Sequence, residues 1–208
     1  YFKSVLLPGF LIPRIVIHIC SASIMTIAPC GFKCSISASA ICAVRMEYVE
    51  KLSGDREYRQ LLERLKELEK DRIYCHHGIG HLLDVARIAY IENLEAQLGL
   101  EKEDIYIAAL LHDLGRVDEY ESGIGHHIAG RERARYFLQK IEYPWERQAV
   151  ILDAIAEHRN KENIEGNEAP MFHRILAKAD RRSRNCRFCD AYESCKWSVE
   201  EKEHRIER

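Results

Sequence analysis

The sequence predicts an all-α protein over residues 46–208, on three observations. Apolar residues recur there at intervals of three and four, glycine and proline separate the periodic stretches, and no alternating run is long enough for a strand. A chain of 208 residues can bury one sizeable core without disulfide or metal staples. We therefore expect a compact helical bundle, preceded by an unstructured or non-native N-terminal segment.

The first two predicted helices lie between residues 53 and 99. Ser53 and Asp55 can each cap the first helix, whose apolar residues share one face. These residues are Leu61, Leu62, Leu65 and Leu68. The second helix follows Gly78 and Gly80, carries a broad apolar stripe and is expected to end at Gly99.

The later helices are separated by breakers in the same way. An almost continuous apolar run, 105–114, is too long for a typical strand and predicts a buried helix that ends at Gly115. Residues 116–125 are expected to form a loop because serine and glycine interrupt them. Three further helices are predicted, at about 126–140, 145–158 (opened by Pro144) and 171–184.

Residues 1–45 differ in composition from the rest of the chain. They are apolar and contain four of the 31 basic residues and none of the 33 acidic ones. Residues 46–208 therefore carry 27 basic and 33 acidic residues, a net charge of −6. This balance excludes a generic polyanion binder, and we predict no nucleic-acid partner.

We interpret residues 1–45 as an apolar leader, either non-native translation upstream of Met46 or a disordered segment. A spanning helix needs about 20 apolar residues, and Pro8, Gly9 and Pro13 interrupt the best window, so we predict no membrane partner and a cytoplasmic protein. An export segment and a genuine extension remain the alternatives. N-terminal sequencing of protein made from the native gene separates them, because peptides upstream of Met46 contradict the leader interpretation.

A histidine and an aspartate stand side by side where the buried helix ends. His112 and Asp113 occur in Ala-Ala-Leu-Leu-His-Asp-Leu-Gly, so the carboxylate is expected to be buried. A buried carboxylate is costly unless it is paired, and a divalent cation is a natural partner, although backbone hydrogen bonds are the alternative. His81 and Asp180 also occupy helical positions among apolar residues.

The order His81, His112-Asp113, Asp180 resembles the HD superfamily of metal-dependent phosphohydrolases. The resemblance spans about residues 73–184, and it implies an HD-type helical bundle with these four residues as metal ligands.

Family members with two metals have histidines in places that match His126 and His158, so the resemblance implies a site with six ligands and two metals. His127 is the alternative to its neighbour His126, and His158 could instead be a solvated histidine at a helix end.

The resemblance implies metal-dependent hydrolysis of a phosphate ester or anhydride, with a nucleotide or a related small phosphate as the substrate. Imidazole and carboxylate ligands suit one or two divalent ions such as Mn, Fe, Ni, Mg or Zn, and Asp113 can orient or deprotonate a water. A metal-sensing, redox-sensing or ligand-binding module without catalysis is an alternative, as is an HD-type di-iron oxygenase with the same six ligands. The sequence gives no indication of the oligomeric state.

Three further residues could contact the substrate. Arg116 and Lys178 lie near the motif and could neutralise phosphate oxygens, although ordinary surface cations are an equal alternative. His77 is four residues before His81 and would share its helix face, either to bind substrate or to cap the helix.

A cysteine cluster follows the last predicted helix, with three thiols in ten residues: Cys186, Cys189 and Cys195. Cys75 precedes His81 by six residues, and Cys186 follows Asp180 by six. If the two ligands meet on antiparallel helices, both thiols are displaced in the same direction by about 9 Å. The sequence thus predicts a second metal site, for Zn or an Fe–S cluster, with free reduced cysteines as the alternative and disulfides least favoured.

Overall fold

The computed structural model describes residues 18–20, 23–25, 46–160, 166 and 168–205. The chain forms two units, Tyr1–Val44 and Arg45–Arg208. In the first unit, β1 (His18–Cys20) pairs antiparallel with β2 (Ser23–Met25), a pairing that the sequence did not predict. Most of the expected leader, residues 1–45, lies outside the described residues, so its interpretation stays a prediction.

The second unit is all-α over its described residues, as predicted. Its α-helices are α1 (Glu47–Gly54), α2 (Arg56–Leu68), α3 (Ile79–Glu95), α4 (Lys102–Leu111), α5 (Arg116–Ser122), α6 (His126–Lys140), α7 (Trp145–Glu157) and α9 (Met171–Arg182). A short 3₁₀ helix, η1 (Cys186–Phe188), follows α9. No helix in the described part of the chain is long and apolar enough to cross a bilayer.

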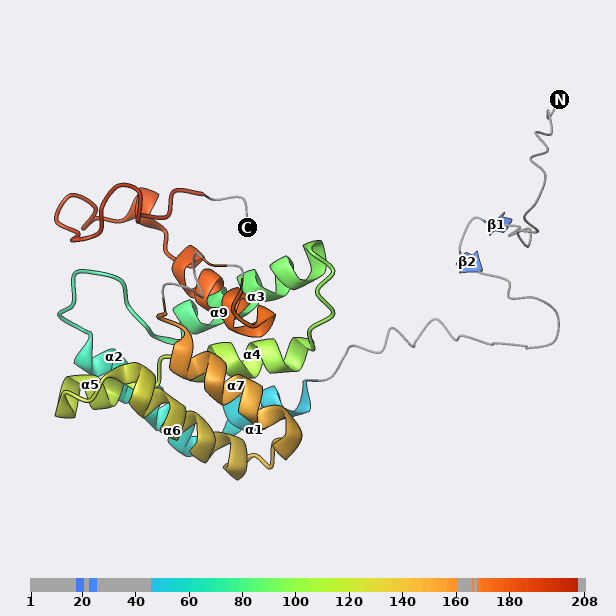
Figure 1. The fold of residues 1–208 in the computed structure, drawn as a ribbon, viewed down its shortest axis with the longest axis horizontal. Coiled ribbons are helices and arrows are strands. Elements are labelled where there is room, and N and C mark those ends of the chain that lie inside the picture. The colour runs from blue at the N-terminus through green and yellow to red at the C-terminus, as the bar shows by residue number, and fades with distance from the viewer. Residues whose placement is uncertain (1–17, 21–22, 26–45, 161–165, 167, 206–208) are drawn as a thin grey trace. The chain divides into compact units, whose positions relative to one another are not determined.

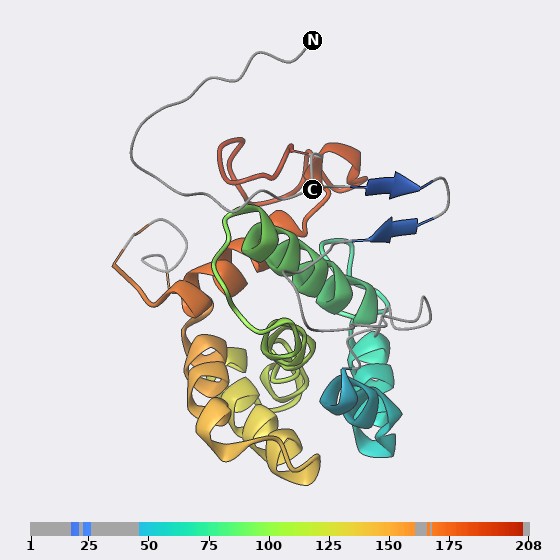
Figure 2. The same ribbon diagram turned by 90° about the vertical axis from the view of Figure 1, so that its right-hand side faces the viewer.

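Helix α4 is the centre of the bundle. It packs against α3, α7 and α1, and Figure 2 shows it nearly end-on between the α6–α7 pair and the α1–α2 pair. Seven of its ten residues are buried, which confirms the buried helix predicted from the apolar run. Helix α3 lies along both α4 and α9 (Figure 1), and α4 also contacts α9. These three helices are therefore neighbours in the bundle.

The N-terminal helices differ from the sequence prediction in two details. Asp55 caps α2, because its side chain accepts a hydrogen bond from the Tyr58 backbone N at 2.9 Å. Ser53 does not cap this helix. It lies inside α1, which the sequence did not predict, and its hydroxyl donates to the Glu50 carbonyl.

The prediction of a loop over 116–125 is wrong, because residues Arg116–Ser122 form α5. Gly123 ends this helix in the left-handed conformation, with φ of 72°, so the breakers act only at its last turn. Val117 is buried, and the Asp118 carboxylate is paired with Arg133 of α6. These tertiary contacts stabilise a helix that is too short to form alone.

Two glycines allow the end of α4 to contact the start of α6. A Cβ atom on Gly115 would lie 2.2 Å from the His126 carbonyl oxygen and 2.3 Å from the Gly130 nitrogen. A Cβ on Gly130 would lie 3.2 Å from the His112 carbonyl oxygen. Only glycine fits at Gly115, and the close approach brings His126 beside Asp113.

Candidate metal centre

Four side chains from three helices meet at the end of α4. His112 is the C-cap of α4, Asp113 follows it, and both are completely buried. The Asp113 Oδ2 atom lies 3.3 Å from Nε2 of His112 and 3.3 Å from Nε2 of His81, on α3. Asp180 of α9 completes the group, with Oδ1 3.2 Å from the His81 Nε2 atom. The structure thus brings together the four residues of the His…His-Asp…Asp pattern.

Asp113 also belongs to a second group of ligands. Its Oδ1 atom lies 3.8 Å from Nε2 of His126, the first residue of α6, and 3.9 Å from Nε2 of His158, the C-cap of α7. His126 is buried and His127 is exposed, so the structure favours His126 of the two candidates. His158 is 1% exposed, which contradicts the alternative of a solvated histidine.

All four histidines present the Nε2 atom to these groups because Nδ1 has another partner. Nδ1 of His112 and of His158 lie 2.7 Å and 2.6 Å from backbone carbonyls in the preceding turn. Nδ1 of His126 lies 2.9 Å from Oε2 of Glu119. The His81 Nδ1 atom lies 3.0 Å from the Ser183 hydroxyl, which donates to the Asp180 carbonyl. Such second partners fix the tautomer and orientation of metal-binding histidines.

Among the described residues, four buried ligand atoms of this site have no hydrogen-bond partner: His112 Nε2, Asp113 Oδ2, His126 Nε2 and His158 Nε2. Buried polar atoms are costly when unpartnered, and cations bound at the two groups of ligands would satisfy all four. The ligand atoms of each group lie within 4.8 Å of one another, and the two groups share Asp113. Imidazole and carboxylate donors in this arrangement fit two divalent ions of the first transition row.

The electrostatics of the site suit a cation. Burial raises the pKa of Asp113, but His112 and Arg116 lower it far more, so the carboxylate is ionised at neutral pH. Burial raises the pKa of Asp180, but Arg184, His112 and His81 together hold it well below its ordinary value. Burial lowers the pKa of His158 to about 4, which leaves it neutral. Ionised carboxylates and neutral imidazoles are the forms that bind metals.

The two carboxylates of the site raise the pKa of His112. Burial lowers its pKa, but Asp113 and Asp180 outweigh this effect and raise it to about 10. Metal binding at Nε2 would therefore displace a tightly held proton, and metal affinity is expected to rise with pH.

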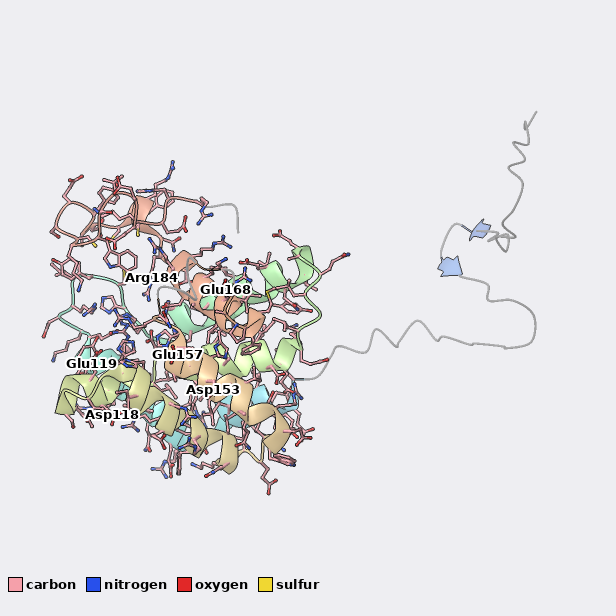
Figure 3. All side chains as sticks on the ribbon, viewed as in Figure 1. Asp118, Glu119, Asp153, Glu157, Glu168 and Arg184 are labelled. Carbon is pink, nitrogen blue, oxygen red and sulfur yellow. The ribbon has the colours of Figure 1, made fainter. Side chains whose placement is uncertain are left out.

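Two arginines reach this group of ligands. Arg116 Nε donates to Asp113 Oδ1 at 3.0 Å, so the structure brings this predicted substrate-binding residue to the site. Arg184 was not identified from the sequence. Its Nη2 atom lies 2.8 Å from Asp180 Oδ1 and 3.4 Å from the His81 Nε2 atom. Its position one helical turn after Asp180 was the available signal. Figure 3, in the same view as Figure 1, labels Arg184 beside α9 and Glu119 near α5.

His77 is held beside the site by a buried carboxylate. Its ring makes an edge contact with His81, with ring centroids 5.6 Å apart. Glu69 is 1% exposed and accepts hydrogen bonds from the His77 backbone N at 2.7 Å, from His77 Nδ1 and from the Tyr120 hydroxyl at 2.7 Å. Burial lowers the pKa of His77 to about 4, so the ring is neutral. The structure therefore favours a buried position next to His81 over a solvated or capping role.

Lys178 does not lie at the site. It lines a surface hollow together with Arg181, Arg182 and residues 200–205, and none of the six ligands lines that hollow. Two residues before Asp180 on α9 correspond to about 200° around the helix, which points Lys178 away from the carboxylate. The structure therefore does not bring Lys178 to the six ligands, and its substrate-binding role stays a prediction.

The four predicted thiols are free cysteines in the structure. Cys186 is buried, and Cys75, Cys189 and Cys195 are partly exposed. Cys75 lies on the connection between α2 and α3, and the other three lie in the segment after α9.

The described part of residues 46–208 forms an all-α fold. Two overlapping groups of histidine and aspartate ligands lie at its helix ends, as in a helical metal-binding domain. The model of the HD domain matches residues 78–185, just over half of the chain. The chain therefore belongs to the HD domain family. The match includes all six ligands of the candidate centre.

Relatives of the chain agree with this assignment. A protein of Clostridium beijerinckii, described only as uncharacterised, is 38% identical over 77% of this chain and 99% of its own length. Ribonuclease Y of Petrotoga mobilis is 28% identical over 57% of this chain, and ribonuclease Y of Fusobacterium nucleatum 27% over 62%. The chain spans only 21% and 23% of those two enzymes.

One solved structure has the same fold. It is a predicted HD superfamily hydrolase from an uncultured Thermotogales bacterium, with a TM-score of 0.50 and 23% identity over 74% of this chain and 86% of that chain. At this identity the likeness concerns the fold alone.

Proposed function

We propose that the protein is a metal-dependent phosphohydrolase with two divalent ions, which cleaves a phosphate ester or anhydride in a nucleotide or a related small phosphate. The observation that carries the proposal is the bridging position of Asp113 between two groups of ligands. When bound, paired ions lower the pKa of a water and neutralise oxygens of a phosphate. Mn, Fe, Ni, Mg and Zn all suit these ligands.

The residues of the chain have separate tasks in this proposal. The six ligands hold the ions: His81, His112, Asp113, His126, His158 and Asp180. Asp113 also has the catalytic task of orienting or deprotonating the attacking water, because its carboxylate is ionised and belongs to both groups of ligands. Arg184 is buried and Arg116 is partly buried, and both cations can bind phosphate oxygens, while His77 positions substrate beside His81.

The choice of a small substrate rests on charge, and the choice of a nucleotide rests on the relatives. Residues 46–208 carry a net charge of −6, which disfavours a long polyanion. The ribonuclease Y relatives are nucleases by name, which supports a phosphate bonded to a nucleoside as the substrate class. We further propose a cytoplasmic protein without nucleic-acid or membrane partners.

A phosphate-release assay with Mn²⁺ on a panel of nucleotides, an RNA oligonucleotide and small phosphate esters tests the proposal. We expect wild-type protein to hydrolyse a nucleotide or small ester, and the Asp113→Ala variant to lose this activity while keeping its helical circular dichroism. Metal bound without hydrolysis would favour a sensor module, and dioxygen consumption by the iron-loaded protein would favour a di-iron oxygenase. Hydrolysis of RNA alone would overturn the choice of a small substrate.

A further inference from the structure

The four cysteines of residues 46–208 come from two parts of the chain that lie side by side. Cys75 lies on the connection between α2 and α3, whereas the other three lie on or after η1. Figures 1 and 2 both show this connection next to the C-terminal segment. The Tyr74 hydroxyl donates to the Ser194 carbonyl at 3.1 Å, so the neighbours of Cys75 and Cys195 are in direct contact.

Local hydrogen bonds fix the backbone in both parts of the chain. Arg72 Nε donates to the Cys75 carbonyl at 2.8 Å, so the Arg72 side chain holds the backbone at this residue. The Cys189 backbone N donates to the Cys186 carbonyl at 3.2 Å, which closes the turn of the Cys-x-x-Cys sequence. Tight turns of this kind place two sulfurs of a Cys-x-x-Cys pair on the same side, as metal sites require.

The pKa of Cys186 depends on the charge of the other three thiols. Burial raises its pKa, a hydrogen bond from the Glu203 backbone lowers it, and Cys75, Cys189 and Cys195 raise it further. Repulsion between thiolates is removed when they share a cation.

The four sulfurs are not at coordinating distance in the structure. Among the described residues, the groups of three or more ligand atoms within 4.8 Å of one another contain no cysteine. A tetrahedral zinc site with Zn–S bonds of about 2.3 Å places its sulfurs about 3.8 Å apart. In the described residues the segment that carries three of the thiols contains one short 3₁₀ helix and no α-helix, so metal binding would require this irregular segment to rearrange around the ion.

We propose that Cys75, Cys186, Cys189 and Cys195 bind one zinc ion as four thiolates. The donor set and the Cys-x-x-Cys turn match structural zinc sites, which have four protein ligands and no open position. The ion ties the connection before α3 to the segment after α9. It thereby fixes the two chain segments that carry His77 and Arg184 at the metal centre.

Metal analysis by mass spectrometry on the full-length protein, purified under reducing conditions, tests the proposal. We expect about one zinc ion that is lost in Cys189→Ser and in Cys75→Ser, which change different segments. A matched control, Cys34→Ser, keeps this zinc, and so does Asp113→Ala, which empties the HD centre. Zinc content unchanged in both cysteine variants, or lost only in Asp113→Ala, would overturn the proposal.

Cobalt substitution covers the case in which a cysteine variant does not fold. The wild-type protein loaded with Co²⁺ is expected to show the strong visible absorption of tetrahedral thiolate cobalt, and prior loading with zinc should suppress it. Absence of this absorption would contradict the site. Acid-labile sulfide in the purified protein, or a disulfide among the four cysteines under reducing conditions, would also overturn it.

Discussion

Oε2 of Glu119 lies 2.9 Å from Nδ1 of His126 and orients this ring toward Asp113. Glu119 belongs to α5, so the second group of ligands depends on a helix that the sequence analysis assigned to a loop. The pKa of Glu119 is below its ordinary value, since His126 and Arg116 outweigh the effect of burial. An ionised carboxylate behind a metal-binding histidine raises the basicity of the ligand.

Replacement of Glu119 by alanine is expected to weaken metal binding. Loss of such a partner typically costs about 10-fold to 100-fold in affinity, and we expect this loss for the ion held by His126 and His158. Isothermal titration with Mn²⁺ measures the effect. Glu121→Ala is the matched control, because Glu121 lies on the same helix and pairs with the exposed Arg64. Equal affinities of the two variants would contradict this role of Glu119.

A methyl group at Gly115 is expected to destabilise the fold. The new Cβ would overlap backbone atoms of α6, which cannot move away as a flexible side chain can. We expect Gly115→Ala to lower the free energy of unfolding by about 3 kcal/mol in urea denaturation. Gly80→Ala serves as the control, because a Cβ there has no heavy atom within 4 Å, and its stability should be unchanged or higher.

The Glu69 carboxylate gives stability a specific pH dependence. Burial raises its pKa, but hydrogen bonds from His77 and Tyr120 lower it from 4.5 to about 2. The unfolded state therefore binds more protons than the folded state between these values, so the stabilisation is present above pH 4.5 and is lost as the pH falls toward 2.

Glu69→Gln removes this dependence. Between about pH 5 and about pH 3 the free energy of unfolding is expected to fall in both proteins. The fall should be about 2 kcal/mol larger in the wild type than in the variant. Urea denaturation of both proteins at the two pH values measures the difference. Parallel pH profiles of the two proteins would show that Glu69 titrates normally.

Replacement of Arg116 or Arg184 is expected to lower the activity, whereas replacement of Lys178 is not. Removal of one buried cation that neutralises phosphate charge typically lowers kcat about 100-fold, and we expect this for Arg116→Ala and Arg184→Ala. Lys178→Ala is the control and should keep the wild-type kcat and KM, because Lys178 faces the surface hollow. A large loss in the lysine variant would contradict the placement of substrate beside Arg184.

The sequence predicted the ligands better than it predicted their surroundings. The all-α class and the burial of α4 followed from periodicity and from a long apolar run, because both are local properties. The six ligands followed from residue order and resemblance, and the structure brings all six together. Glu119 contacts His126 of another helix, and Ser183 and Arg184 contact His81 of α3; these contacts depend on tertiary packing. Only the contact of Arg184 with Asp180 is local.

The sequence analysis missed helix α5 and placed Lys178 near the site because it relied on local pattern and on nearness in the chain. Helix α5 is short and polar and is held by buried Val117 and by a pair between Asp118 and Arg133, neither of which a local pattern reveals. Lys178 was assigned by its nearness to Asp180 in the chain, but helical phase turns it away.

The number of ions bound at the HD centre tests the central claim most directly. Metal-stripped protein with the thiol site loaded with zinc is titrated with Mn²⁺, and bound manganese is counted for wild type, His158→Ala and Asp113→Ala. We expect about two ions in the wild type, about one in His158→Ala and none in Asp113→Ala. Two ions bound in Asp113→Ala, or one ion in the wild type, would contradict a centre bridged by Asp113.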